Sequence, residues 1–243
     1  MKIYFFKNGD TPLTFFGAKR QLNAPFEEKE QRYVTVVHLP FNTATLKKAS
    51  SKKTKKLDAR LFEYDGAIFS NAFFDKLPIT AERMIRPTGE NLFLKLCPNI
   101  AWEASVKYKI DPDKAQVTVM GAGADKEMLE RLLSKFKNLY LSNVNDELSE
   151  ELYYECGAAL PVLSEKSAYE SDIIIFTEKN EYKHFKGIKI GFDINGKGCI
   201  GNNNLRYYGG PIAELSSLQG RPLSIGEVES AVPGGTGIKI SIK

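Results

Sequence analysis

Cysteine and histidine are scarce in this sequence of 243 residues. Cys97, Cys156 and Cys199 lie far apart and form no C-x-x-C pair, so they suggest neither a disulfide framework nor a zinc site. The two histidines have no partner at ligand spacing. We therefore expect reduced thiols and no metal.

Long apolar runs are also absent. No stretch approaches the roughly 20 apolar residues of a membrane-spanning helix, and residues 1–8 turn polar too soon for a signal peptide. The composition, 42% hydrophobic and 26% charged, is ordinary for a globular protein. We expect a cytoplasmic protein with no membrane partner.

Two catalytic motifs are missing as well. No Walker lysine follows the glycine turn at residues 121–123, which excludes a P-loop, and the sequence has no G-x-S-x-G nucleophile elbow.

Positive charge is modest but unevenly spread. The net charge of +4 does not imply nucleic acid by itself, yet lysines crowd the segment from Lys47 to Lys56. This segment is predicted to be a loop or an exposed helix. It either is a solvated surface or binds phosphate groups, including those of a nucleic acid.

Strands alternate with helices along much of the chain. The first part has expected strands at residues 1–7, 32–38 and 65–70, followed by a helical pattern from Thr88 to Tyr108 that Pro98 should kink or divide. Later strands are expected at residues 116–120, 138–142, 158–163, 171–177 and 187–193, and helices at 125–137, 145–156 and 211–219.

This alternation predicts an α/β protein with right-handed crossovers and a parallel sheet covered on both faces. We expect an N-terminal α/β domain over residues 1–110. A Rossmann-like domain follows over residues 111–243, and its final segment returns to pack against the first part.

The segment from Val117 to Asp125 carries the most specific signal. An apolar strand runs into Gly121-Ala122-Gly123 and then into a helix, which is the arrangement that binds a dinucleotide pyrophosphate. Asn143 ends the next strand, where the ribose would lie, and Thr177 ends a later one near the nicotinamide or substrate.

Two residues depart from the fingerprint. Lys126 occupies the place of the third glycine, which normally lets the helix pack closely on the strand. Asp125 should cap the helix well, but its charge would repel a pyrophosphate.

The pattern from residue 117 to 177 resembles the cofactor domain of shikimate dehydrogenase and its relatives. The matching pieces are the Gly-Ala-Gly turn, Ser142-Asn143-Val144-Asn145 after the second strand, and Asp172 followed by an apolar run to Thr177. Pro233-Gly-Gly-Thr-Gly237 is similar to a turn of methylenetetrahydrofolate dehydrogenases. These resemblances imply a small domain before a Rossmann domain and the use of NAD or NADP. Shikimate dehydrogenases use a Lys and Asp pair of the first domain, which residues 1–110 do not show.

The leading hypothesis is an NAD(P)-dependent oxidoreductase that acts on a small anionic substrate in a cleft between the two parts, as a monomer or a homodimer. His38, at a predicted strand end, is its best histidine for acid or base work, although a structural role is the commoner one. The alternative, favoured by Asp125 and Lys126, is a non-enzymatic Rossmann-like binding or regulatory protein. Nucleic-acid binding through the lysine segment is the third hypothesis.

Overall fold

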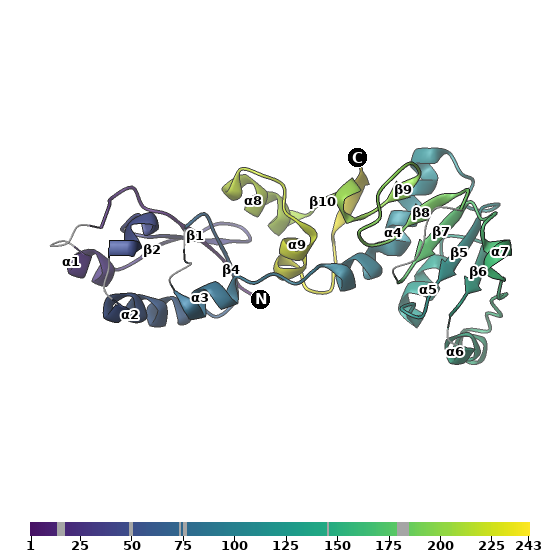
Figure 1. Ribbon diagram of the computed structural model, residues 1–243, viewed down its shortest axis with the longest axis horizontal. Coiled ribbons are helices and arrows are strands. Elements are labelled where there is room, and N and C mark those ends of the chain that lie inside the picture. Colours follow the sequence, from purple (N-terminus) through teal and green to yellow (C-terminus); the bar gives the residue numbers. More distant parts are fainter. Residues whose placement is uncertain (14–17, 49–50, 73, 75–76, 145, 179–184) are drawn as a thin grey trace. The chain divides into compact units, whose positions relative to one another are not determined.

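The computed structural model describes residues 1–13, 18–48, 51–72, 74, 77–144, 146–178 and 185–243 (Figure 1). The chain divides into two units by its backbone contacts. Unit 1 comprises residues 1–87 and 209–232, and unit 2 comprises residues 88–208 and 233–243. This division differs from the boundary expected at residue 110, because the helix that begins at Glu90 packs within unit 2.

Unit 1 contains a four-stranded sheet in the order β2-β3-β1-β4. Its strands are β1 (Ile3–Lys7), β2 (Glu27–Glu30), β3 (Thr35–His38) and β4 (Ala67–Ser70). β1 is parallel to β3 and β4, whereas β2 runs antiparallel to β3 at the edge. The sequence did not indicate β2, because its residues are all charged and exposed, as suits an edge strand.

Unit 1 also contains several helices (Figure 1). They are α1 (Ala18–Asn23), α2 (Ser51–Phe62), α3 (Pro78–Arg83), α8 (Gly210–Gln219) and α9 (Ile225–Ala231), with a 3₁₀ helix at Thr43–Lys48. Leu57 and Leu61 of α2 pack in one buried cluster with Phe6 of β1 and Ile68 of β4. Residues 51–56 of the lysine-rich segment therefore form the first part of a helix that Leu57 and Leu61 anchor to the core.

Residues 209–232 return to unit 1 and pack closely on it. The Tyr33 amide donates to Glu214 Oε2 at 3.1 Å. A Cβ at Gly210 would lie 2.2 Å from Cζ of Tyr33, and one at Gly226 would lie 2.1 Å from the Pro87 carbonyl oxygen. Unit 1 is thus assembled from two segments that are distant in the sequence.

Unit 2 is built around a parallel sheet of five strands in the order β6-β5-β7-β8-β9. The strands are β5 (Gln116–Met120), β6 (Asn138–Ser142), β7 (Ile173–Phe176), β8 (Ile188–Ile190) and β9 (Cys199–Ile200). The helices are α4 (Glu90–Tyr108), α5 (Lys126–Leu133), α6 (Asp146–Cys156) and α7 (Glu165–Ala168), with a 3₁₀ turn at Asn202–Asn204. The expected first residue of α6, Asn145, lies outside the described residues.

A short extended segment continues this sheet beyond β6. The Leu141 amide donates to the Pro161 carbonyl oxygen at 3.0 Å, and the Leu163 amide donates to the Leu141 carbonyl oxygen at 2.8 Å. Leu141 and Val162 thus form a parallel bridge. Counted along the chain, the strands then follow the order 3-2-1-4-5-6 of dinucleotide-binding Rossmann folds. The predicted α/β class and Rossmann-like domain are confirmed.

Of the two predicted effects of Pro98, a kink or a division of the helix, the division does not occur in α4. Pro98 lies buried inside the continuous helix Glu90–Tyr108. A proline inside a helix lowers its stability by about 3 kcal/mol. Leu92 and Leu96 before Pro98 and Ile100 after it are buried, so the helix packs into the core on both sides of the proline. Packing therefore holds the helix together through the proline.

The end of the chain also packs in unit 2. β10 (Leu205–Tyr208) and β11 (Lys239–Ile242) form an antiparallel pair, and β11 packs against α4. Among the helices that the structure describes, none has both the length and the apolar character needed to cross a membrane.

Candidate functional site

The glycine turn after β5 lies where the strand order of unit 2 reverses direction, between β5 and β7. Gly121 has a positive φ of 108°, and its amide donates to the Ser142 carbonyl oxygen at 3.1 Å. The Gly123 amide donates to Thr177 Oγ1 at 3.1 Å. Thr177 in turn donates its hydroxyl to the Met120 carbonyl oxygen at 3.2 Å. The Thr177 hydroxyl therefore joins the end of β7 to the turn.

Close approach of Thr177 accounts for both glycines. A Cβ at Gly121 would lie 2.8 Å from Thr177 Oγ1, and one at Gly123 would lie 2.8 Å from the Thr177 carbonyl oxygen. Real Cβ atoms do not come this near to other heavy atoms. The turn needs glycine to pack against the neighbouring strand, whether or not a phosphate binds there.

Asp125 caps the helix that follows the turn. Its Oδ1 accepts a hydrogen bond from the Met128 amide at 2.7 Å, and its backbone is extended, as an N-cap residue requires. The carboxylate also places a negative charge at the positive end of α5. In a dinucleotide site this position belongs to the pyrophosphate.

Lys126 lies on the side of α5 that faces α6. Its ammonium pairs with the carboxylates of Glu155 and Glu151, the second at 3.6 Å. Since α5 begins only at Lys126, the third fingerprint position is the first helical residue and not a point of contact with the strand. A lysine is tolerated there for this reason.

The other predicted cofactor residues lie at the same edge of the sheet. Asn143 follows β6 directly, is exposed and has a left-handed backbone with φ of 52°. Ala122 is exposed at the tip of the turn, whereas Thr177 is buried. Because Gly121 bonds to Ser142 and Gly123 to Thr177, the fold brings the predicted site residues together.

A small cavity lies at this edge beside β7. Its volume is about 10 Å³, and its lining residues are Glu90, Leu94, Phe176, Thr177, Glu178 and Phe192. A cavity of this size holds roughly one water molecule. The strand order and the glycine turn have the arrangement of a dinucleotide site. The end of α5, however, is already capped by the Asp125 carboxylate where a pyrophosphate would bind, and the cavity is too small for a nicotinamide.

Unit 1 gathers polar side chains at the carboxyl ends of its own parallel strands. Asn8, just after β1, accepts hydrogen bonds at Oδ1 from the Thr43 amide at 2.8 Å and its hydroxyl at 3.1 Å. Its Nδ2 donates to Asn42 Oδ1 at 3.2 Å, and its amide donates to Asn71 Oδ1 at 3.0 Å. The asparagine network ties three strand ends together.

The sequence did not indicate this network, although each asparagine follows a predicted strand within a few residues. His38 lies at the same edge, half-buried at the end of β3 and in register with Lys7 of β1. Its role in acid or base work stays a prediction.

The lysine segment exposes much of its charge on α2. Lys52, Lys55 and Lys56 are exposed, while Asp58 is buried and accepts hydrogen bonds from the Thr80 amide at 2.9 Å and its hydroxyl at 2.6 Å. Residues 49 and 50 lie outside the described residues. Nucleic-acid binding by this segment stays a prediction.

No protein-family model and no curated protein matches the sequence. Among solved structures, the chain is similar to an L-tryptophan dehydrogenase from Nostoc punctiforme, with 14% identity and a TM-score of 0.30. The match covers 72% of this chain and 56% of that chain. It is also similar to a chorismate mutase/shikimate 5-dehydrogenase fusion protein from Clostridium acetobutylicum, with 12% identity, a TM-score of 0.25 and coverage of 72% and 67%.

Proposed function

We propose that unit 2 binds NAD or NADP at the carboxyl edge of its sheet and that the chain is an NAD(P)-dependent oxidoreductase of a small anionic substrate. The observation that carries this proposal is the position of the Gly121-Ala122-Gly123 turn at the switch point of a sheet with strand order 3-2-1-4-5-6. Open α/β sheets bind ligands at this point.

The chain's own residues would then have distinct tasks. Backbone groups of Gly121, Ala122 and Gly123 would lie along the diphosphate, Asn143 would reach the ribose, and Thr177 would fix the turn beside the nicotinamide. The bound nicotinamide would supply the hydride chemistry. Binding requires that the Asp125 carboxylate either break its hydrogen bond with the Met128 amide or remain beside a bound phosphate. It also requires that the small cavity widen.

The second candidate is a binding or regulatory protein that uses no dinucleotide. Two observations favour it: the Asp125 carboxylate already occupies the helix end at 2.7 Å from the Met128 amide, and the adjoining cavity is only about 10 Å³. In this case the glycine turn serves packing alone.

Thermal unfolding with millimolar NAD, NADH, NADP and NADPH separates the two candidates. A cofactor at about 100 times its dissociation constant stabilises the native state by roughly 2.7 kcal/mol. The first proposal expects a rise of several degrees with at least one of the four compounds. No rise with any of them supports the second candidate.

Two matched variants test whether the rise in unfolding temperature comes from binding at the glycine turn. Ala122→Glu adds a carboxylate at the exposed tip of the turn and should abolish the rise without altering unfolding in buffer. Ala59→Glu makes the same change on the exposed side of α2 and should leave the rise intact. An equal rise in both variants would place the cofactor elsewhere on the chain.

A further inference from the structure

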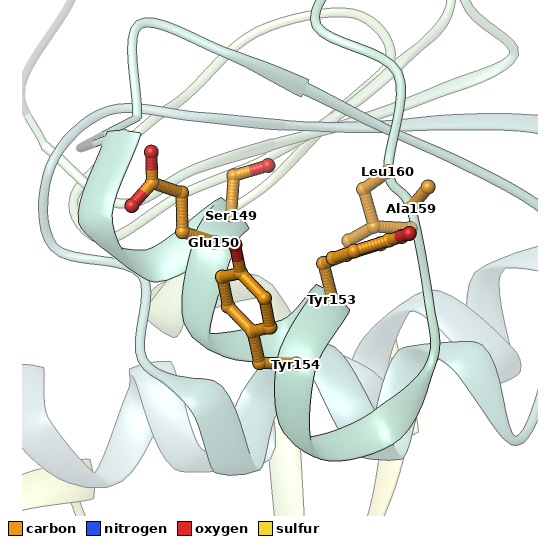
Figure 2. A pocket seen from close by; sticks show the side chains of 6 residues that line it. All are labelled: Ser149, Glu150, Tyr153, Tyr154, Ala159 and Leu160. Atoms are coloured by element: carbon orange, nitrogen blue, oxygen red, sulfur yellow. The ribbon is translucent and has the colours of Figure 1, made fainter.

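A surface pocket lies along α6, apart from the proposed cofactor residues. It has a volume of about 240 Å³ and is lined by Ser149, Glu150, Tyr153, Tyr154, Ala159 and Leu160. Figure 2 shows the Tyr154 ring extending toward Ser149 and Glu150, and the Tyr153 ring extending toward Ala159 and Leu160. The pocket therefore has an apolar end at Ala159 and Leu160 and a carboxylate, that of Glu150, at the other end.

Its two aromatic rings are unusually exposed. Tyr153 and Tyr154 are 56% and 81% exposed as whole residues, and their ring centroids lie 5.5 Å apart at an interplanar angle of 75°. Two nearly perpendicular rings present a π face and an edge to whatever enters between them. A π face attracts a cation, and a carboxylate nearby strengthens the attraction.

The charged residues of the pocket lining and of α6 are all acidic. None of its six lining residues is basic, and α6 itself carries Asp146, Glu147, Glu150, Glu151 and Glu155 without a lysine or arginine. Lys126 of α5 pairs with Glu151 and Glu155. Glu150 has no ion-pair partner in the part of the chain that the structure describes. The Glu150 carboxylate therefore leaves room for an ion pair with a cation of another molecule.

Another depression of unit 2 offers a useful contrast. It has a volume of about 490 Å³ and combines Trp102 with the acidic residues Asp111 and Asp113. There the chain supplies its own cation, because Lys135 Nζ lies 5.4 Å from the Trp102 ring centroid. The α6 pocket has the same kinds of groups, an aromatic ring and a carboxylate, but its lining lacks the lysine.

The size of the pocket restricts the ligand. Sites for drug-sized molecules or cofactors occupy about 300 to 1,000 Å³, and this pocket is smaller. Tyrosine is enriched where protein partners bind, because it combines a large apolar ring with a polar tip. The acidic helix complements a basic partner in charge.

We propose that the α6 pocket binds one lysine or arginine side chain of a basic partner polypeptide. The cationic end lies against Tyr154 and Glu150, and the aliphatic part of the side chain packs toward Tyr153 and Leu160. This role does not depend on whether unit 2 binds a dinucleotide.

Titration of the full-length chain with short peptides, followed by amide NMR shifts, tests the proposal. The probe is acetyl-Gly-Gly-Lys-Gly-Gly-amide, and its partner probe replaces lysine with norleucine, which keeps the stem and removes the charge. The lysine peptide should shift the amide signals of Tyr153 and Tyr154, and its binding should weaken as salt is added. The norleucine peptide should not shift them.

Two variants identify the groups that bind the cation. Tyr154→Leu and Glu150→Gln should each weaken binding of the lysine peptide roughly two- to five-fold, as expected for exposed cation–π and ionic contacts. Tyr108→Leu and Glu103→Gln, which change an exposed tyrosine and a half-buried glutamate on α4, should leave it unchanged. Circular dichroism verifies that each variant is folded.

Three results would overturn the proposal. The first is a lysine peptide that causes no shift at millimolar concentration, or that binds the Tyr154 and Glu150 variants as well as it binds the α4 variants. The second is tetramethylammonium binding as tightly as the peptide, which would indicate a site for a free small cation. The third is self-association that is lost when Lys52, Lys55 and Lys56 become glutamine, which would assign the pocket to α2 of a second copy.

Discussion

Gly123 illustrates how a single residue can serve packing where its motif suggests ligand binding. A Cβ at this position would lie 2.8 Å from the Thr177 carbonyl oxygen, and a backbone atom cannot move aside as a side chain can. The sequence motif is the same in either case. Only the distance to the neighbouring strand distinguishes the two reasons for the glycine.

The Gly123→Ala variant should therefore lose about 1 to 3 kcal/mol of unfolding free energy, the usual cost of overpacking. Urea unfolding monitored by circular dichroism measures the loss. Gly157→Asn is the control, since Gly157 has nothing within 4 Å and a left-handed φ of 66° that asparagine tolerates. An equal loss in both variants would contradict the steric explanation.

Glu227 is a buried carboxylate in unit 1 whose ionised form the fold stabilises. Burial by itself would raise its pKa, but hydrogen bonds from Arg221 and Ser224 outweigh burial and lower the pKa from 4.5 to about 2. Arg221 donates to Glu227 at 2.7 and 2.9 Å, and the Ser224 amide donates at 2.8 Å.

A lowered pKa in the folded state means that the stabilisation is present above pH 4.5 and is lost as the pH falls toward 2. Since Arg221 is more than half exposed, we expect a loss of only about 1 to 2 kcal/mol. Urea unfolding at pH 5 and at about pH 2 should show this loss in the wild type. Glu227→Gln should show a smaller pH dependence, and an identical dependence in both proteins would refute the role of Glu227.

At the scale of the element, the start of α5 determines how the glycine turn can be used. Asp125 completes the helix by accepting the Met128 amide, and Lys126 ties the first turn to α6 through Glu151 and Glu155. The first turn of α5 therefore already has a hydrogen-bond acceptor and ion-pair partners from the chain itself. Any anionic ligand has to compete with a carboxylate that is already in place.

Asp125→Asn keeps an N-cap side chain and removes the charge. We expect the unfolding free energy to change by less than about 1 kcal/mol, and the affinity for NAD or NADP to rise if either cofactor binds at the turn. Isothermal titration calorimetry measures the affinity, and Asp113→Asn, outside the turn, serves as the control. A fall in affinity in Asp125→Asn alone would mean that the carboxylate itself binds the cofactor, for example at a ribose.

At the scale of the whole molecule, unit 1 depends on a segment distant in sequence. Residues 209–232 complete it through the Tyr33 to Glu214 hydrogen bond and through the tight approach of Gly226 to Pro87. Residues 1–87 alone should therefore be incompletely folded.

Adding a synthetic peptide of residues 209–232 to a fragment of residues 1–87 should raise the helical circular dichroism signal above the sum of the separate spectra and make unfolding more cooperative. A peptide with Gly226→Ala should do this less well, because the added Cβ would lie 2.1 Å from the Pro87 carbonyl oxygen. A fragment whose unfolding is unaffected by either peptide would contradict the assignment of residues 209–232 to unit 1.

The α/β class and several elements of unit 2 could be predicted from the sequence, whereas α7, β9, β10 and β11 were not. Periodicity and glycine positions are local properties, and they placed β5, β6 and β7 close to their observed bounds. The helix expected over residues 125–137 begins as predicted but already ends at Leu133. The same local information predicted that Gly121, Gly123, Asn143 and Thr177 would meet, since parallel strands end at one edge of a sheet.

Features that depend on contacts between distant residues could not be predicted from the sequence. Burial of α4 on both sides of Pro98 keeps that helix continuous, and the approach of Thr177 to the turn explains its glycines. The sequence predicted that a final segment returns to the first part, but the bounds of that segment, residues 209–232, depend on contacts with residues remote in sequence. Local patterns do not encode these distances, because they arise from packing energies summed over the whole unit.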